Sequence, residues 1–69
     1  MRRFLRNTKT GAFFRTATRW TPDQNEAHDF EEIDMALRVA RELRLQNVEL
    51  VDVLDDGTEL MATRLNSDF

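Results

Sequence analysis

Apolar residues recur at helical spacing in one part of the chain, residues 30–45. Five of them fall on one stripe of a helix: Ile33, Ala36, Leu37, Ala40 and Leu43. Acidic residues dominate the first turn of this segment and arginines follow, which matches the helix dipole. The pattern predicts a single amphipathic helix whose apolar stripe must be buried against the rest of the chain.

The residues before the helix predict a hairpin. Segments 2–7 and 12–16 are rich in phenylalanine and arginine, and the turn between them contains Gly11, which can adopt a positive φ. Two registers fit this turn, with Asn7 opposite either Ala12 or Gly11. The second register places two arginines opposite each other, which is mildly destabilising. We therefore favour the first register.

Residues 17–28 predict a connection between the hairpin and the helix. Within it, Trp20 is expected to plug one end of the core. The run Thr21-Pro22-Asp23-Gln24 has the features of a helix start, with a threonine N-cap followed by proline, so it predicts about one turn of helix. Asp29 and Glu32 have the spacing of a capping box for the main helix.

The residues after the helix predict a second hairpin, with strands at 48–54 and 60–65. The dipeptide Asp56-Gly57 between them is a strong hairpin signal. A two-residue turn there sets three cross-strand pairs: Val53 with Leu60, Val51 with Ala62, and Glu49 with Arg64. The last of these would be a favourable ion pair, which supports the register. Asn47 is a candidate for a left-handed conformation at the end of the main helix.

The order strand, strand, helix, strand, strand predicts an α+β fold, ββαββ, in which an antiparallel sheet of two hairpins packs on one amphipathic helix. Residues 1–69 are expected to form one small domain with a loose tail at 66–69. The order of the two hairpins within the sheet stays open.

Both hairpins carry large apolar residues on both faces, whereas one helix can cover only one face. Each large apolar side chain left in water forgoes about 1.5–3 kcal/mol of burial. The face turned away from the helix is therefore a candidate interaction surface, made of Phe4, Phe13, Arg2, Arg6, Arg15, Val51 and Val53. We expect a homodimer or a larger protein partner. The alternative is that residues such as Trp20 and Phe69 cover this face.

The charge distribution is uneven. Residues 1–20 carry six basic and no acidic residues, and residues 21–69 carry four basic and all thirteen acidic residues, for a net charge of -3. We favour internal complementarity between the two parts of the fold. The alternative is that the basic, aromatic N-terminal hairpin binds single-stranded nucleic acid, with arginines on phosphates and phenylalanines under bases. The sequence pI of about 5.0 argues against that alternative.

The sequence carries no pattern typical of a catalytic, metal or cofactor site. Cysteine is absent, His28 is the only histidine, and the two glycines lie in separate turns. We therefore expect no enzyme activity and no cofactor. Since the chain has no apolar run long enough to span a membrane and no disulfides, we expect a cytoplasmic protein. The order of an aromatic hairpin, a Trp-Thr-Pro connector and a helix resembles short bacterial or phage proteins, a resemblance that implies no activity.

Overall fold

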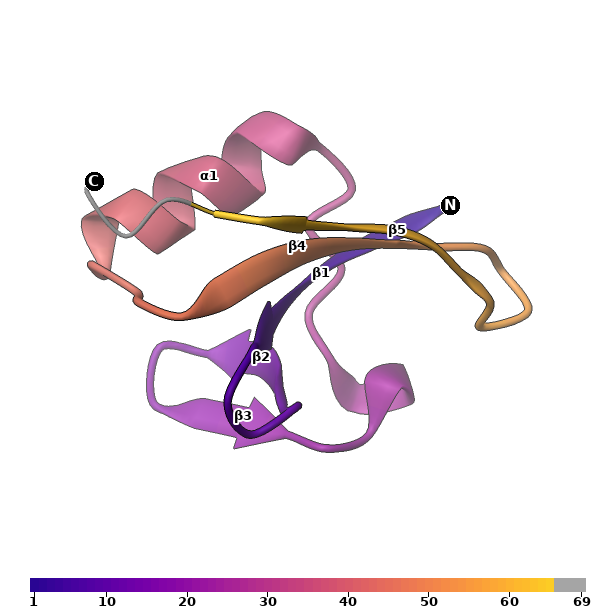
Figure 1. The fold of residues 1–69 in the computed structure, drawn as a ribbon, viewed down its shortest axis with the longest axis horizontal. Helices are drawn as coiled ribbons and strands as arrows, with labels where there is room; N and C mark the ends of the chain where they lie inside the picture. Colours follow the sequence, from indigo (N-terminus) through magenta and orange to yellow (C-terminus); the bar gives the residue numbers. More distant parts are fainter. Residues whose placement is uncertain (66–69) are drawn as a thin grey trace.

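The computed structural model describes residues 1–65. Their elements follow the order β1 (Arg2–Asn7), β2 (Phe13–Thr16), β3 (Arg19–Thr21), a 3-10 helix η1 (Gln24–Glu26), α1 (Ile33–Glu42), β4 (Val48–Val53) and β5 (Glu59–Arg64). The strands form one antiparallel sheet in the order β3-β2-β1-β4-β5, and α1 packs along one side of it (Figure 1). The predicted α+β fold is confirmed, with one strand more than expected.

The two hairpins join through β1 and β4, which pair antiparallel over six residues from Arg2↔Val53 to Asn7↔Val48. This pairing settles the strand order that the sequence left open. The first hairpin has the favoured register, because Arg6 lies opposite Phe13. Consistently, the Asn7 amide donates to the Ala12 carbonyl at 2.8 Å.

The additional strand is β3, which forms within the predicted connection. Trp20 pairs with Phe14 and Thr21 pairs with Phe13, so the chain turns back on β2 directly after it ends. The predicted N-cap at Thr21 is wrong for this reason. The short helix η1 begins later and is capped by Asp23, whose carboxylate accepts the Asn25 amide at 2.9 Å. A three-residue strand is too short to leave a periodic signal in sequence.

The start of α1 differs from the predicted capping box. Asp29 does not cap the helix, because its Oδ1 accepts the backbone amides of Arg3 at 3.0 Å and Glu31 at 2.9 Å. The N-cap residue is Glu32, and its side chain makes no capping hydrogen bond. Asp29 therefore attaches the helix entry to β1 instead of stabilising the first turn.

The helix ends in a Schellman motif, with Arg44 in the left-handed region at φ 51°. The amide of Leu45 donates to the carbonyl of Ala40 at 2.9 Å, and that of Arg44 donates to Arg41 at 3.1 Å. Asn47 also has a positive φ, 57°, but it lies beyond the helix and leads into β4.

The second hairpin has the predicted register in its outer part. Glu49 lies opposite Arg64 and Val51 opposite Ala62, but Val53 lies opposite Glu59 rather than Leu60 because β5 carries a bulge there. The turn has three residues instead of two, since the Leu54 amide bonds the carbonyl of residue 58 at 2.8 Å and Gly57 adopts φ +92°. A type I turn followed by a left-handed glycine is a common three-residue hairpin.

Apolar side chains are buried on both faces of the sheet. The helix-side cluster consists of Leu5, Phe14, Phe30, Ala36, Ala40 and Leu50. On α1 only the two alanines are fully buried, while Ile33 and Leu43 of the predicted stripe remain exposed. The second cluster lies on the opposite face and consists of Phe4, Phe13, Val51 and Val53.

Candidate interaction surfaces

The apolar part of the predicted interaction surface is already covered within a single chain. Phe4, Phe13, Val51 and Val53 are each at most 7% exposed. The expectation that one helix leaves this face bare is therefore wrong. Trp20 does not cover it either, because that side chain packs on the helix-side cluster. Phe69, the other residue expected to cover it, lies outside the described residues.

The second cluster is covered in part by residues 22–27, which we call the covering segment, and in part by Arg2 and Arg6, whose guanidiniums lie over the Phe4 and Phe13 rings. Ala27 of this segment packs directly on the cluster, and Thr21, just before it, is buried on the same face. The Thr21 hydroxyl accepts the Asp23 amide at 3.1 Å and donates to the Glu26 carboxylate at 3.2 Å. These bonds fold the covering segment back over the sheet.

The chain then passes from one face of the sheet to the other between Ala27 and Phe30. Ala27 packs on the second cluster, whereas Phe30 belongs to the helix-side cluster. The crossing is held by backbone bonds to both neighbouring strands: the His28 amide donates to Phe14 in β2 at 3.0 Å, and the Phe30 amide donates to Arg3 in β1 at 2.9 Å. Figure 1 shows this connection running past β1 from η1 to α1. One connection thus carries the chain from the covering segment on one face of the sheet to the helix on the other.

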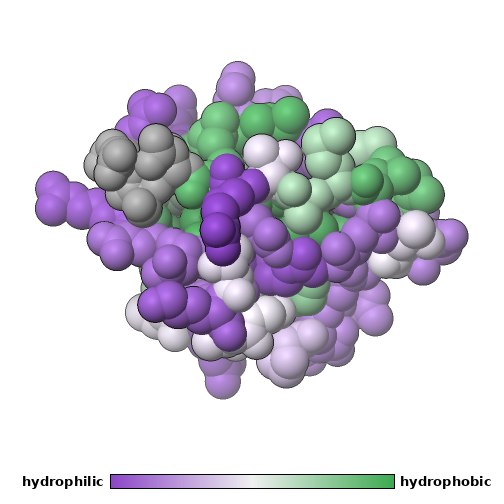
Figure 2. Space-filling model, in the orientation of Figure 1, coloured by the Kyte–Doolittle hydropathy of each residue, from purple (hydrophilic) through white to green (hydrophobic). Residues whose placement is uncertain are grey.

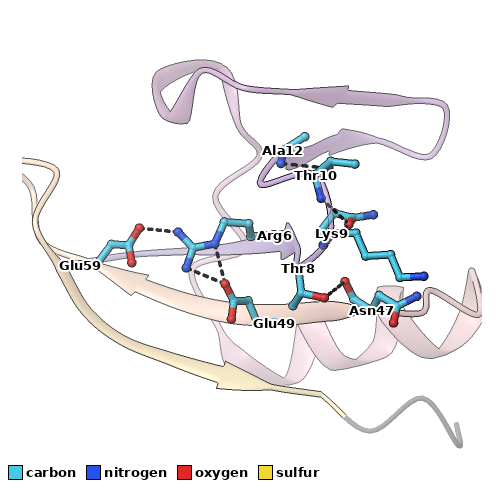
Figure 3. A network of polar contacts seen from close by, with 9 residues as sticks. Arg6, Thr8, Lys9, Thr10, Ala12, Asn47, Glu49 and Glu59 are labelled. Carbon is cyan, nitrogen blue, oxygen red and sulfur yellow. Dashed lines mark hydrogen bonds and ion pairs between the residues drawn. The ribbon is translucent and has the colours of Figure 1, made fainter.

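Arg6 lies over the second cluster. Figure 3 shows its guanidinium between the carboxylates of Glu49 and Glu59. Its guanidinium bonds Glu49 of β4 at 2.5–2.6 Å and also bonds Glu59 of β5. Its side chain crosses the Phe13 ring, with 5.8 Å between the guanidinium carbon and the ring centroid. Partial burial opposes the charge, but the two carboxylates outweigh it and raise the pKa of Arg6 above its usual value. The predicted Glu49–Arg64 ion pair is replaced, because Glu49 binds Arg6.

Other N-terminal cations also have partners inside the fold. Arg3 lies 3.1 Å from the Asp52 carboxylate and donates to the Glu31 carbonyl at 2.5 Å. Arg15 pairs with Glu26 of the covering segment at 3.4 Å. Internal complementarity between the basic and acidic parts of the sequence is therefore confirmed. Of the predicted surface arginines, only Arg2 makes no ion pair within residues 1–65, and its guanidinium lies 5.4 Å from the Phe4 ring centroid.

Strand β5 is the most exposed element of the sheet. All six of its residues are exposed, and they include two large apolar side chains, Leu60 at 52% and Met61 at 60%. The strand pairs only with β4, so its other edge is open among the described residues. Figure 2 shows apolar surface beside β5 and over α1, within a largely hydrophilic surround. Sequence reasoning missed this surface because the sequence does not reveal which strand lies at the edge.

The hydrogen bonds between β4 and β5 show which residues of β5 direct their backbone N–H and C=O groups toward the open edge. The Leu65 amide donates to the Val48 carbonyl at 3.0 Å, so residues 61, 63 and 65 direct their backbone groups toward β4. The alternate residues Ala62 and Arg64 therefore direct theirs away from the sheet. This open edge offers a further strand both donors and acceptors.

The remaining described surface carries two depressions, one along the outer side of α1 and one at its start. The larger depression, about 440 Å³, lies along the outer side of α1 and is lined by Asp34, Leu37, Arg38, Arg41 and Glu42. The lining of this open depression holds two acidic and two basic side chains, so its formal charge is balanced. His28 is exposed and packs edge-on against Phe30, with 4.6 Å between ring centroids. Within residues 1–65 no group of three or more potential ligands could hold a metal ion, and none of the helices is long and apolar enough to cross a membrane.

The chain matches no protein-family model, no curated protein and no solved structure. Any functional reading therefore depends on the geometry of this fold alone.

Proposed function

We propose that this protein is a non-catalytic interaction module that binds another protein chain through the open edge of β5. The observation that carries the proposal is an edge strand of six residues, exposed throughout, with two large apolar side chains and two outward-directed backbone positions. Adding an extended strand to such an edge is a recurring mode of protein recognition.

The opposite edge of the sheet, formed by β3, is less suited to bind a partner strand than β5. Strand β3 has three residues and its pairing with β2 is irregular, features that protect an edge from further pairing. Strand β5 is twice as long and carries only two charged residues, one at each end. The two edges therefore differ in their capacity to bind a partner strand.

Nucleic-acid binding by the N-terminal hairpin has weaker support. Binding a phosphate backbone requires cations that are free to neutralise phosphates, which releases the counterions condensed on the nucleic acid. Arg6 and Arg15 of that face are already engaged with carboxylates, and the two phenylalanines that would stack on bases are buried. If the protein does not bind single-stranded DNA or RNA even at low salt, this alternative is excluded.

The test compares the wild-type chain with A62P as tagged proteins in the same host. Proline at position 62 removes an outward donor without removing a bond to β4, so the fold should survive. The proposal predicts that the wild type captures protein, either a second copy or another chain, that A62P does not. Circular dichroism of both purified proteins checks folding. Equal capture by the two folded proteins would refute the proposal.

A further inference from the structure

We propose that the partner of the β5 edge is a second copy of this chain, and that two sheets join into one antiparallel sheet around a two-fold axis between the two β5 strands. This inference rests on the proposed function, because it names the occupant of the same edge. It is carried by the self-complementary pattern of backbone groups and charges along residues 59–64.

The direction of the backbone groups in β5 limits the registers in which two β5 strands can pair. A two-fold axis between antiparallel strands runs perpendicular to the sheet and keeps every side chain on its own face, so outward-directed residues must pair with outward-directed residues. Pairing Ala62 with Ala62 of the second copy meets this condition, since both amides and both carbonyls point across the interface. It also places the smallest side chain of the strand at the axis, where each copy meets the same residue of the other.

In this register the charged residue at each end of one β5 lies near the oppositely charged residue at the other end of the second copy's β5. Arg64 lies opposite the bulge formed by Glu59 and Leu60 of the second copy, on the face away from α1. The Arg64 side chain makes no ion pair within residues 1–65, and the Glu59 side chain is 43% exposed with one carboxylate oxygen on Arg6. Two-fold symmetry creates the Glu59–Arg64 contact twice.

Other registers lose this complementarity. A shift of two residues in either direction moves Arg64 away from Glu59 of the second copy. A shift of four residues toward the end of the strand places the two Arg64 side chains opposite each other, which is unfavourable. In the chosen register Met61 lies opposite Thr63 of the second copy on the helix side of the sheet. Exposed apolar area is therefore covered along with the charges.

The decisive experiment is charge reversal followed by mixing, measured by analytical ultracentrifugation of the purified chain. The wild type is expected to reach twice the 8.1-kDa chain mass as concentration rises. E59K and R64E alone each create two like-charge contacts in the dimer, so we expect at least a tenfold weaker association. An equimolar mixture of E59K and R64E restores opposite charges at both contacts, and we expect it to form a mixed dimer. K9E, which alters charge in the exposed turn of the first hairpin, should associate like the wild type.

Each outcome decides the matter. Recovery in the mixture supports the inference, provided that Trp20 fluorescence and circular dichroism show each variant folded. A wild type that stays monomeric at millimolar concentration overturns it, and so does a dimer that neither reversal weakens. If the purified chain is monomeric but capture in the host still depends on Ala62, the inference fails while the proposed function stands. If no capture depends on Ala62, both fail.

Discussion

Truncating Val51 tests whether the face away from the helix is a true second core. Val51 lies in β4 with no exposed surface, among the other side chains of the second cluster. V51A removes two buried methyl groups, worth about 0.8 kcal/mol each. A residual cavity of about 40 Å³ would add up to about 1 kcal/mol. We therefore expect the free energy of unfolding to fall by about 2–3 kcal/mol.

The loss is large for a chain of this size, because 69 residues typically have an unfolding free energy of about 3.5–10 kcal/mol. Urea unfolding followed by Trp20 fluorescence measures it, since Trp20 packs edge-on against Phe14 at 5.6 Å and should change emission on unfolding. Low-micromolar protein keeps self-association from contributing to the measured stability.

The matched control is V39A on α1, where the same two methyl groups are only partly buried. Replacing valine by alanine inside a helix also gains about 0.5 kcal/mol of helix propensity, so the net change should stay below about 1 kcal/mol. If V51A cost no more than V39A, the second cluster would not be the dry core that its burial indicates.

Three further predictions concern the acids that bond Arg6, the end of α1 at Arg44, and Asp56 in the turn between β4 and β5. E49Q should cost about 1–2 kcal/mol and E59Q less than about 0.5, because the two side chains bonding Arg6 are 19% and 43% exposed; equal losses in urea unfolding would contradict this. R44G should be more stable than R44A by about 1 kcal/mol, since only glycine adopts the left-handed φ at that position without strain; both variants lose the same charge, so a thermal melt isolates the backbone effect. Hydrogen bonds from the turn lower the pKa of Asp56, so its stabilising contribution is present above its ordinary value and is lost as pH falls through the lowered one. The stability gap between wild type and D56A should therefore narrow as the pH falls below the ordinary aspartate pKa, and a constant gap in thermal melts would refute the linkage.

The elements predicted well from sequence are those fixed by local chemistry. The long apolar period placed the helix, and the turn with Gly11 together with arginine repulsion selected the right register for the first hairpin. In the second hairpin the pairs Glu49–Arg64 and Val51–Ala62 were right, whereas the turn length and the pairing of Val53 were wrong. The start of α1 was less predictable, because the Asp29 carboxylate accepts the Arg3 amide of β1 instead of capping the helix.

The sequence predicts that Ala27 points inward, but it does not predict that the covering segment lies on the second cluster. Its contact with the second cluster depends on Ala27, a small residue in a polar stretch that has no period. The decisive step is tertiary: the chain crosses from one face to the other through bonds to Phe14 and Arg3, which are distant in sequence. Strand order, and with it the exposure of β5, is tertiary information of the same kind.

Covering both faces changes which groups remain available to a partner. With the second cluster buried and two of the three predicted surface arginines engaged, the predicted surface offers a partner little apolar area. What the fold leaves open is backbone at one edge of the sheet. Backbone groups that stay unpaired are satisfied by water in the isolated chain and by another strand in a complex. An interface of this kind depends on register and end charges more than on large side chains, which is why Ala62 and Arg64 are the positions whose replacement separates binding from folding.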